Sequence, residues 1–190
     1  MLMNKQDLQM SLLLDLEKAT PSNRSKMTKQ VNFLMSLIDE IEFSFEEMNV
    51  MVTDEGHFNV GSFIECYLKA KYNGEMYPSY SAKGLKDLTL KYYDNEGKRH
   101  TKSFEVKTVL RNESSEVTAN KLDLLVISYN GINFLSRKKY NEIKDNPDYF
   151  KKGTHRLNKN ILQECEHFEM NNLHDLLMSD YFEKKASRKA

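Results

Sequence analysis

Two apolar segments on either side of a short polar turn are the feature that most constrains the fold of this 190-residue chain. Apolar residues are interspersed with polar ones from Leu85 to Tyr93 and again from Ser103 to Leu110, a pattern typical of strands. Between the segments, Asp94-Asn95-Glu96-Gly97 contains the residue types that favour tight turns. The sequence therefore predicts a β-hairpin at this place.

The hairpin places charged side chains near one another. With residues 94–97 as the loop, Asp87 falls opposite Phe104, or opposite Glu105 if one strand carries a bulge. Alternate side chains of a strand share a face, so Glu105 and Lys107 point the same way. We expect them on a face or end of the sheet away from the core, which Phe104 and Val106 contact on the other side.

Two carboxylates and one ammonium at a strand edge suit metal-assisted cleavage of phosphodiesters. Mg²⁺ prefers oxygen ligands and usually takes one or two carboxylates together with substrate phosphate. Asp87 and Glu105 are the expected metal ligands, and the metal lowers the pKa of a bound water. Lys107 would orient that water or neutralise charge in the transition state.

These residues resemble the PD-(D/E)XK nucleases, which include many type II restriction endonucleases, resolvases and repair nucleases. The match consists of Asp87 at the start of one strand and Glu105-Val106-Lys107 in the next. Segment Val60–Tyr72 is similar to the family's first core helix, where Glu65 takes the position of a glutamate near the metal site. The resemblance covers roughly residues 60–160. It implies an α/β core with a mixed central sheet flanked by helices, Mg²⁺-dependent hydrolysis and double-stranded DNA as substrate.

The chain departs from the family pattern before the first carboxylate, where Lys86 replaces proline. The D/E-x-K motif also occurs four times in this sequence, at Glu96–Lys98, Glu105–Lys107, Glu142–Lys144 and Glu183–Lys185. The first lies in the predicted turn, the third in a predicted helix and the fourth in a polar tail. Only the second has an apolar strand around it, so its context selects it.

Other interpretations stay open. Glu105 and Lys107 could form an ordinary solvated strand face, and Glu65 could pair with Lys69 on an exposed helix face. The chain would then be a non-catalytic nucleic-acid-binding or protein-interaction module. A nuclease of the same fold acting on branched DNA or RNA is a third possibility. The hypothesis that we carry forward is a Mg²⁺-dependent endonuclease of the type II restriction or mobile-element defence kind.

The net charge of zero is unevenly distributed. Residues 33–57 contain seven acids and no lysine or arginine, residues 69–111 contain ten bases and five acids, and residues 137–159 contain eight bases and three acids. A basic cleft facing phosphates would produce this pattern. Solvated lysines on an ordinary surface would produce it as well.

The length suits one domain with a helical extension. We expect the extension over residues 1–50, with amphipathic helices at 4–19 and 26–48, a nuclease-like core over residues 51–182 and a frayed tail at 183–190. The N-terminal helices would pack on the core or, alternatively, form a homodimer surface.

Further elements complete the predicted core. Residues 122–129 and 132–135 predict a buried strand and its hairpin partner, and residues 136–144 begin a helix. The basic segment 151–160 suits a loop that contacts DNA through Arg156, Asn158 and Lys159, although an ordinary surface loop would look the same.

Several classes of site lack their sequence signatures. Cys66 and Cys165 have no disulfide or zinc spacing, which favours a reducing cytoplasm. The five histidines form no metal motif, and there is no phosphate-binding glycine loop or serine-hydrolase elbow. We find no signal layout and no apolar run of membrane length, so we expect a cytoplasmic protein with no membrane partner.

Overall fold

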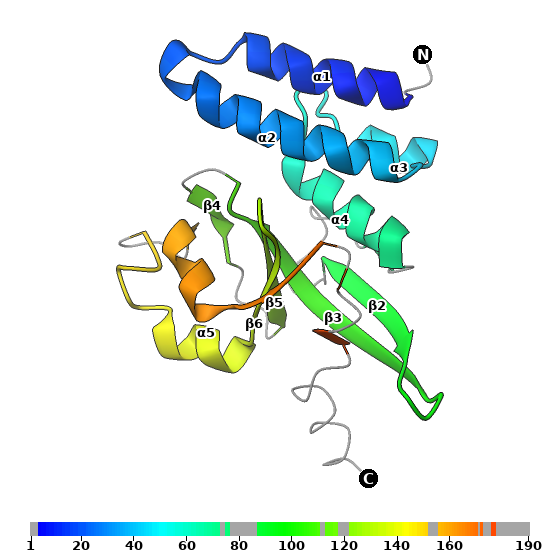
Figure 1. The fold of residues 1–190 in the computed structure, drawn as a ribbon, viewed down its shortest axis with the longest axis vertical. Helices are drawn as coiled ribbons and strands as arrows, with labels where there is room; N and C mark the ends of the chain where they lie inside the picture. Colours follow the sequence, from blue (N-terminus) through cyan, green and yellow to red (C-terminus); the bar gives the residue numbers. More distant parts are fainter. Residues whose placement is uncertain are drawn as a thin grey trace. The chain divides into compact units, whose positions relative to one another are not determined.

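The computed structural model describes residues 4–72, 75–76, 87–110, 113–117, 122–151, 156–170, 172 and 176–177 (Figure 1). The chain divides into unit 1, Met1–Leu88, and unit 2, Thr89–Ala190, and each is described below by itself. Helices together with a mixed sheet confirm the predicted α/β (α+β mixed) fold class. The division falls inside the segment 51–182 that the sequence suggested as one core, and the predicted tail at 183–190 lies outside the described residues.

Unit 1 is helical over most of its described length. Side chains at the helix starts explain the boundaries: Asn4 and Asp7 form a capping box, and Pro21 occupies a first-turn position that tolerates proline. The elements are α1 (Lys5–Glu17), α2 (Pro21–Glu40), α3 (Phe45–Val50), α4 (Val60–Tyr72) and the short strand β1 (Glu75–Met76).

The second predicted helix is wrong in its boundaries. It begins at Pro21 rather than at residue 26, because proline lacks only an amide that a first helical turn leaves unbonded. The helix then stops at Glu40, and α3 begins separately after Ser44, whose side chain and that of Glu47 form another capping box. The capping signal at Ser44 therefore overrode a continuous apolar pattern.

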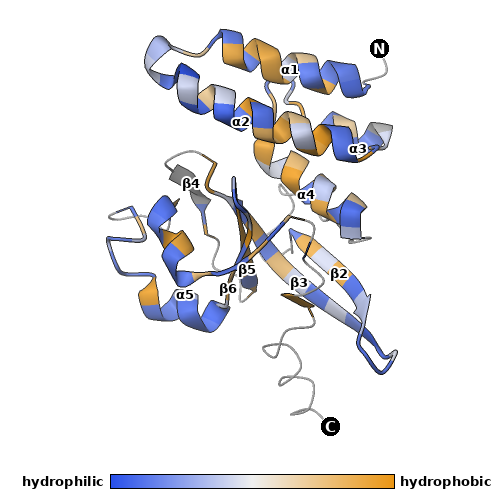
Figure 2. Ribbon diagram, viewed as in Figure 1, coloured by the Kyte–Doolittle hydropathy of each residue, from blue (hydrophilic) through white to orange (hydrophobic). Residues whose placement is uncertain are grey.

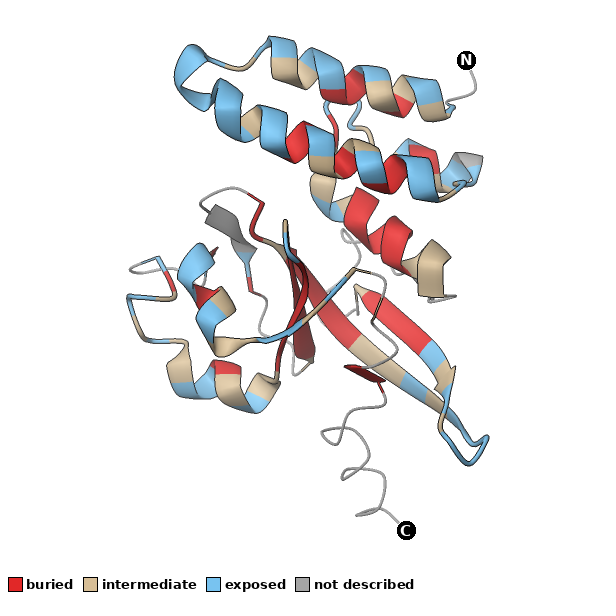
Figure 3. Ribbon diagram, viewed as in Figure 1, coloured by how far each residue is buried: buried red, intermediate tan, exposed pale blue. Residues whose placement is uncertain are grey.

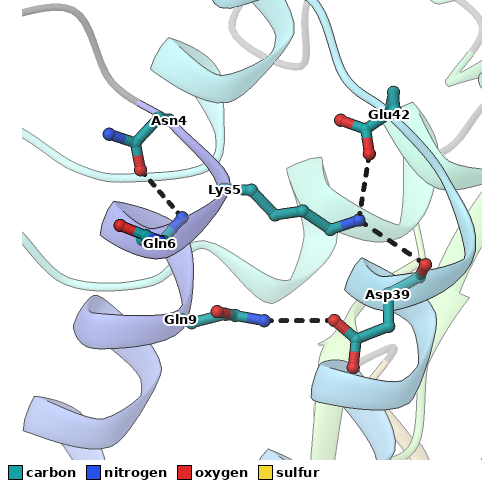
Figure 4. A network of polar contacts seen from close by, with 6 residues as sticks. All are labelled: Asn4, Lys5, Gln6, Gln9, Asp39 and Glu42. Carbon is teal, nitrogen blue, oxygen red and sulfur yellow. Dashed lines mark hydrogen bonds and ion pairs between the residues drawn. The ribbon is translucent and has the colours of Figure 1, made fainter.

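Polar contacts join the start of α1 to the end of α2 (Figure 4). Lys5 Nζ lies 3.3 Å from Glu42 Oε1 and 3.5 Å from the Asp39 carbonyl, and Gln9 Nε2 donates to Asp39 Oδ1 at 3.1 Å. These contacts are exposed, so they orient the two helices more than they stabilise them.

The core of unit 1 is aromatic around α4. The ring of Phe63 lies 5.3 to 6.3 Å from the rings of Phe58, Phe43 and Tyr67. Buried leucines of α1 and α2 line their apolar sides, which Figures 2 and 3 show as orange and red turns. Burial of such side chains is the main favourable term in folding this unit.

Unit 2 is built on a mixed sheet. Its elements are β2 (Leu88–Tyr93, whose first residue closes unit 1), β3 (Arg99–Thr108), β4 (Glu113–Glu116), β5 (Asp123–Ser128), β6 (Gly131–Leu135), α5 (Arg137–Ile143), β7 (Arg156–Asn158), the 3₁₀ helix η1 (Lys159–Glu164) and β8 (Glu166–Phe168). Five of these strands lie in the order β2-β3-β5-β6-β8, and β4 pairs with β7 in a separate sheet. β3 and β5 are parallel, whereas β5–β6 and β6–β8 are antiparallel.

The predicted strands at 122–129 and 132–135 and the helix at 136–144 are confirmed as β5, β6 and α5. All six residues of β5 and all five of β6 are buried, so these strands are covered on both faces. Strands of this kind are continuous apolar runs in the sequence, which is why they could be predicted. Among the described residues, no helix has both the length and the apolar character needed to cross a lipid bilayer.

The β2–β3 hairpin is confirmed, but its register differs by one residue from the prediction. The Asp94 amide donates to the Lys98 carbonyl at 3.0 Å, which leaves a three-residue loop closed by Gly97 at φ +76°. Farther along, the Thr89 and Ser103 hydroxyls lie 2.9 Å apart. Both pairs belong to the same antiparallel register, so no bulge lies between them. In this register, position 93 lies across from position 99 rather than 98.

Candidate functional site

Glu105 and Lys107 form a buried ion pair on β3. Lys107 Nζ lies 3.2 Å from Glu105 Oε1, and the two side chains share a face by strand alternation. Glu105 is 0% exposed and Lys107 is 9% exposed. The structure therefore contradicts the expectation of an outward or solvated face, while it does bring these two predicted residues together.

The reason for this burial lies in the parallel pairing of β3 with β5. Glu105 is in register with Leu124 and Lys107 with Val126, so the pair shares its face with these two aliphatic side chains. Leu124 and Val126 belong to a buried apolar cluster that also contains Tyr140 of α5. The charged pair thus lies at the border of an apolar core, where the low dielectric strengthens the attraction between the two charges.

Arg137, which was not among the residues predicted from the sequence, adds a second cation to the pair. Its Nη1 lies 4.0 Å from Glu105 Oε2, and its guanidinium carbon lies 4.2 Å above the centre of the Tyr140 ring. Its backbone amide donates to Asp123 Oδ1 at 2.8 Å, which fixes the start of α5 against β5. The sequence did contain a signal for Arg137. It is a basic residue directly after Ser136, the N-cap of α5, and the end of β6 fixes where α5 begins.

Burial raises the pKa of the Tyr140 phenol, with smaller contributions from Arg137, which lowers it, and from Glu105, which raises it. The phenol is therefore neutral at physiological pH and offers a donor or acceptor beside the guanidinium. Glu105, Lys107, Arg137 and Tyr140 together make up the candidate site of unit 2.

A second carboxylate and lysine pair lies on the other face of the sheet. Asp123 is in register with Phe104, and its Oδ2 lies 3.4 Å from Lys102 Nζ. Lys102 and Lys107 therefore belong to the same strand, pair with carboxylates at similar distances, and point to opposite faces. This arrangement gives the candidate site an internal control.

The two remaining catalytic candidates fall in unit 1. Asp87 is half-buried and directly precedes β2. Glu65 lies in the middle of α4 and is 8% exposed, so the exposed helix face proposed for it is wrong. Lys69, its suggested partner, lies 3.5 Å from Glu47. The predicted helix 60–72 itself is confirmed as α4.

Within the part of the chain that the structure describes, no group of three or more histidine, cysteine, aspartate or glutamate side chains is placed to hold a metal ion. The oxygen donors of Glu105 and Asp87 nevertheless have the chemistry that Mg²⁺ selects, since Mg²⁺ needs only one or two carboxylates and completes its shell with water and phosphate.

The predicted DNA-contacting loop at 151–160 contains regular structure in its described part, and residues 152–155 lie outside the described residues. Residues 156–158 form β7, which pairs with β4, and Lys159 begins η1. Asn158 is the N-cap of η1: its side chain accepts from the Asn160 amide at 2.8 Å and donates to the Asp148 carbonyl at 2.7 Å. Its amide group therefore has a role in the fold, and its assignment as a DNA contact stays a prediction. Arg156 and Lys159 are exposed.

Comparison of the chain with protein-family models, with curated proteins and with solved structures finds no match in any of the three.

Proposed function

We propose that this protein is a Mg²⁺-dependent endonuclease that hydrolyses phosphodiester bonds in double-stranded DNA, of the type II restriction or mobile-element defence kind. The observation that supports this proposal is the 3.2 Å pairing of Glu105 with Lys107 on a buried strand. Burying charges costs free energy, and clustered charges beside an apolar core are a frequent sign of a functional site.

Glu105 and Asp87 would hold the metal in this proposal. Asp87 directly precedes β2 in unit 1, and Glu105 lies on β3 in unit 2. That both carboxylates reach one metal ion is a premise of the proposal. Bound Mg²⁺ would supply Lewis acidity and a water of lowered pKa.

The cations of the site would act on the substrate. Lys107 would orient the attacking water or neutralise the charge that develops on the oxygens of the scissile phosphate. Arg137 would add a planar donor suited to phosphate, and its contact with the Tyr140 ring keeps the guanidinium in place. Glu65 remains a fourth candidate, buried in α4.

One observation favours the second candidate function, a non-catalytic nucleic-acid-binding or protein-interaction module. Glu105 is 0% exposed and lies near both Lys107 and Arg137. A purely structural ion-pair network that joins β3 to α5 would have the same geometry. In that case Glu105 and Lys107 would hold the sheet and helix together without contacting any substrate.

The deciding experiment incubates the purified full chain with mixed duplex DNA in Mg²⁺ or EDTA and resolves the products on a gel. Wild type is compared with Lys107→Ala and with the matched control Lys102→Ala, which removes a lysine of the same strand from the opposite face. Discrete fragments from wild type and Lys102→Ala in Mg²⁺, but not from Lys107→Ala, support the proposal. Folded wild type that leaves duplex DNA intact overturns it, and equal cleavage by Lys107→Ala removes this pair from the active site.

A further inference from the structure

The end of the β2–β3 hairpin extends beyond the rest of the sheet. Pairing of β3 with β5 begins at Phe104, so residues 99–103 reach past it together with their partners in β2. Figure 3 shows this outer part of the hairpin, toward the turn, as largely exposed or half-buried, whereas the strand ends near β5 are buried. A two-stranded ribbon of this kind presents two side-chain faces to its surroundings.

The two faces of the ribbon differ in chemistry. One face contains Tyr92 and His100, whose rings stack at 5.4 Å with an interplanar angle of 26°. His100 Nε2 also lies 2.6 Å from Asp94 Oδ2. The other face carries Lys91, Tyr93, Arg99 and Thr101, all exposed; we call these four residues the ribbon face.

The ribbon face is positively charged and aromatic. Lys91 and Arg99 supply two cations and Thr101 a hydroxyl, and none of the four positions is acidic. Tyr93 is 63% exposed and is among the few large apolar side chains that the described residues leave open to solvent. Lysine, arginine, tyrosine and threonine are the side chains that contact nucleic-acid phosphates, and positive charge governs affinity for duplex DNA.

Local contacts hold the ribbon in one conformation. Asp94 Oδ1 accepts from the amides of Glu96 and Lys98 at 3.0 and 2.8 Å, and the His100 contact engages its other oxygen. The hydrogen bond from His100, followed by those from the backbone, holds the pKa of Asp94 below its ordinary value. Asp94 is therefore directed into the turn, and a pre-organised ribbon loses less entropy on binding.

The ribbon face continues along β3 toward the candidate site. Alternation places Arg99, Thr101, Ser103, Glu105 and Lys107 on one face of the strand. Arg99 and Glu105 are six residues apart, which is about 20 Å along an extended strand. A duplex lying on the ribbon would thus run in line with the Glu105–Lys107 pair.

We infer that the ribbon face, formed by Lys91, Tyr93, Arg99 and Thr101, is a docking surface for the sugar-phosphate backbone of double-stranded DNA. The choice of duplex DNA as occupant rests on the proposed function, and the charge of the ribbon face is complementary to that occupant. Glu96, exposed in the turn, is the acid that opposes binding at the tip.

The test measures binding without cleavage. Fluorescence anisotropy follows the purified full chain on a 20-base-pair duplex in EDTA, at several salt concentrations, for wild type, Lys91→Ala/Arg99→Ala and Tyr93→Ala. The matched control is Lys138→Ala/Lys144→Ala, which removes the same charge from α5 and the turn after it. Since each phosphate contact contributes about 0.9 to the slope of log affinity against log salt, the ribbon double variant should lose about 2 in slope and roughly tenfold in affinity. Tyr93→Ala should weaken binding without changing the slope.

Distinct results separate this inference from the proposed function. Ribbon-dependent binding without cleavage in Mg²⁺ supports the ribbon face and overturns the nuclease. Cleavage that needs Lys107 together with a ribbon double variant that binds no worse than the α5 control overturns the ribbon face and keeps the nuclease. Stronger binding of single-stranded DNA or RNA than of the duplex also overturns the inference. Circular dichroism of each variant checks that these exposed substitutions leave the fold unchanged.

Discussion

Glu105 and Lys107 face each other across 3.2 Å on the same side of β3, both in the buried part of that strand. Neither charge has much water to solvate it, so each depends on the other and on Arg137, 4.0 Å from the second oxygen of Glu105. This dependence makes the stability of unit 2 sensitive to removal of either partner.

Glu105→Gln removes the negative charge while keeping the shape of the side chain. We expect the free energy of unfolding to fall by roughly 3 kcal/mol, because breaking a buried pair leaves the other charge uncompensated. Urea denaturation followed by circular dichroism measures the change. The double variant Glu105→Leu/Lys107→Met removes both charges and should recover most of the loss while abolishing any cleavage. A double variant as unstable as the single one would contradict the pairing.

Gly131→Ala should destabilise the β5–β6 hairpin far more than Gly97→Ala destabilises the β2–β3 turn. Both glycines have positive φ, but a Cβ on Gly131 would lie 2.4 Å from the Phe168 carbonyl oxygen of β8, whereas one on Gly97 meets no atom within 4 Å. We expect about 1 kcal/mol for Gly97→Ala, from the left-handed backbone alone, and roughly 3 kcal/mol for Gly131→Ala, from the added clash. Thermal unfolding of both variants compares them, and equal shifts in melting temperature would exclude the close approach of β8.

The stability of unit 1 should depend on pH through the Glu40 carboxyl group. The Tyr67 hydroxyl donates to Glu40 Oε2 at 2.6 Å and Lys71 Nζ at 2.9 Å, and these bonds lower the pKa of the Glu40 carboxyl from its ordinary value of 4.5. A carboxyl whose folded pKa is depressed contributes stability that is present above its unfolded pKa and is lost as pH falls through the folded one. Stability should therefore decline as pH drops below about 4.5.

Tyr67→Phe tests that dependence while keeping the buried ring. The variant should be less stable than wild type at pH 7 and should lose less stability on acidification, because the strongest cause of the shift is gone. Urea midpoints at pH 7, 5, 4 and 3 give the comparison. Parallel pH profiles for the two proteins would remove Glu40 from the acid-sensitive groups.

Substitutions in the segment 156–160 should distinguish a residue that stabilises the fold from basic residues that contact DNA. Asn158→Ala removes the cap of η1 and should cost about 1 kcal/mol of stability with no change in salt dependence of DNA binding. Arg156→Ala and Lys159→Ala should each reduce the salt slope by about 0.9 if their side chains contact phosphate. Anisotropy and urea denaturation on the same preparations check both statements. A stability loss confined to the two basic variants would reverse these roles.

Much of the fold was legible from the sequence because local physics determined it. The stretch 60–72 had helical character, the runs that became β5 and β6 were apolar throughout because both their faces are covered, and Gly97 closed a turn in the hairpin. Local signals also misled: an apolar pattern joined α2 to α3 until the Ser44 capping box separated them. Strands β4, β7 and β8 escaped prediction, since each is short and their pairing is a long-range event.

The sequence by itself determined that Glu105 and Lys107 share one face of one strand, because strand alternation is a property of the backbone. It could not determine that this face is buried, that Arg137 approaches from α5, or that Asn158 caps η1, since those facts depend on elements brought together from distant parts of the chain. The hairpin register lay between the two. A shift of one loop residue moves every cross-strand partner, and only the tertiary structure, through the Asp94–Lys98 and Thr89–Ser103 contacts, decided it.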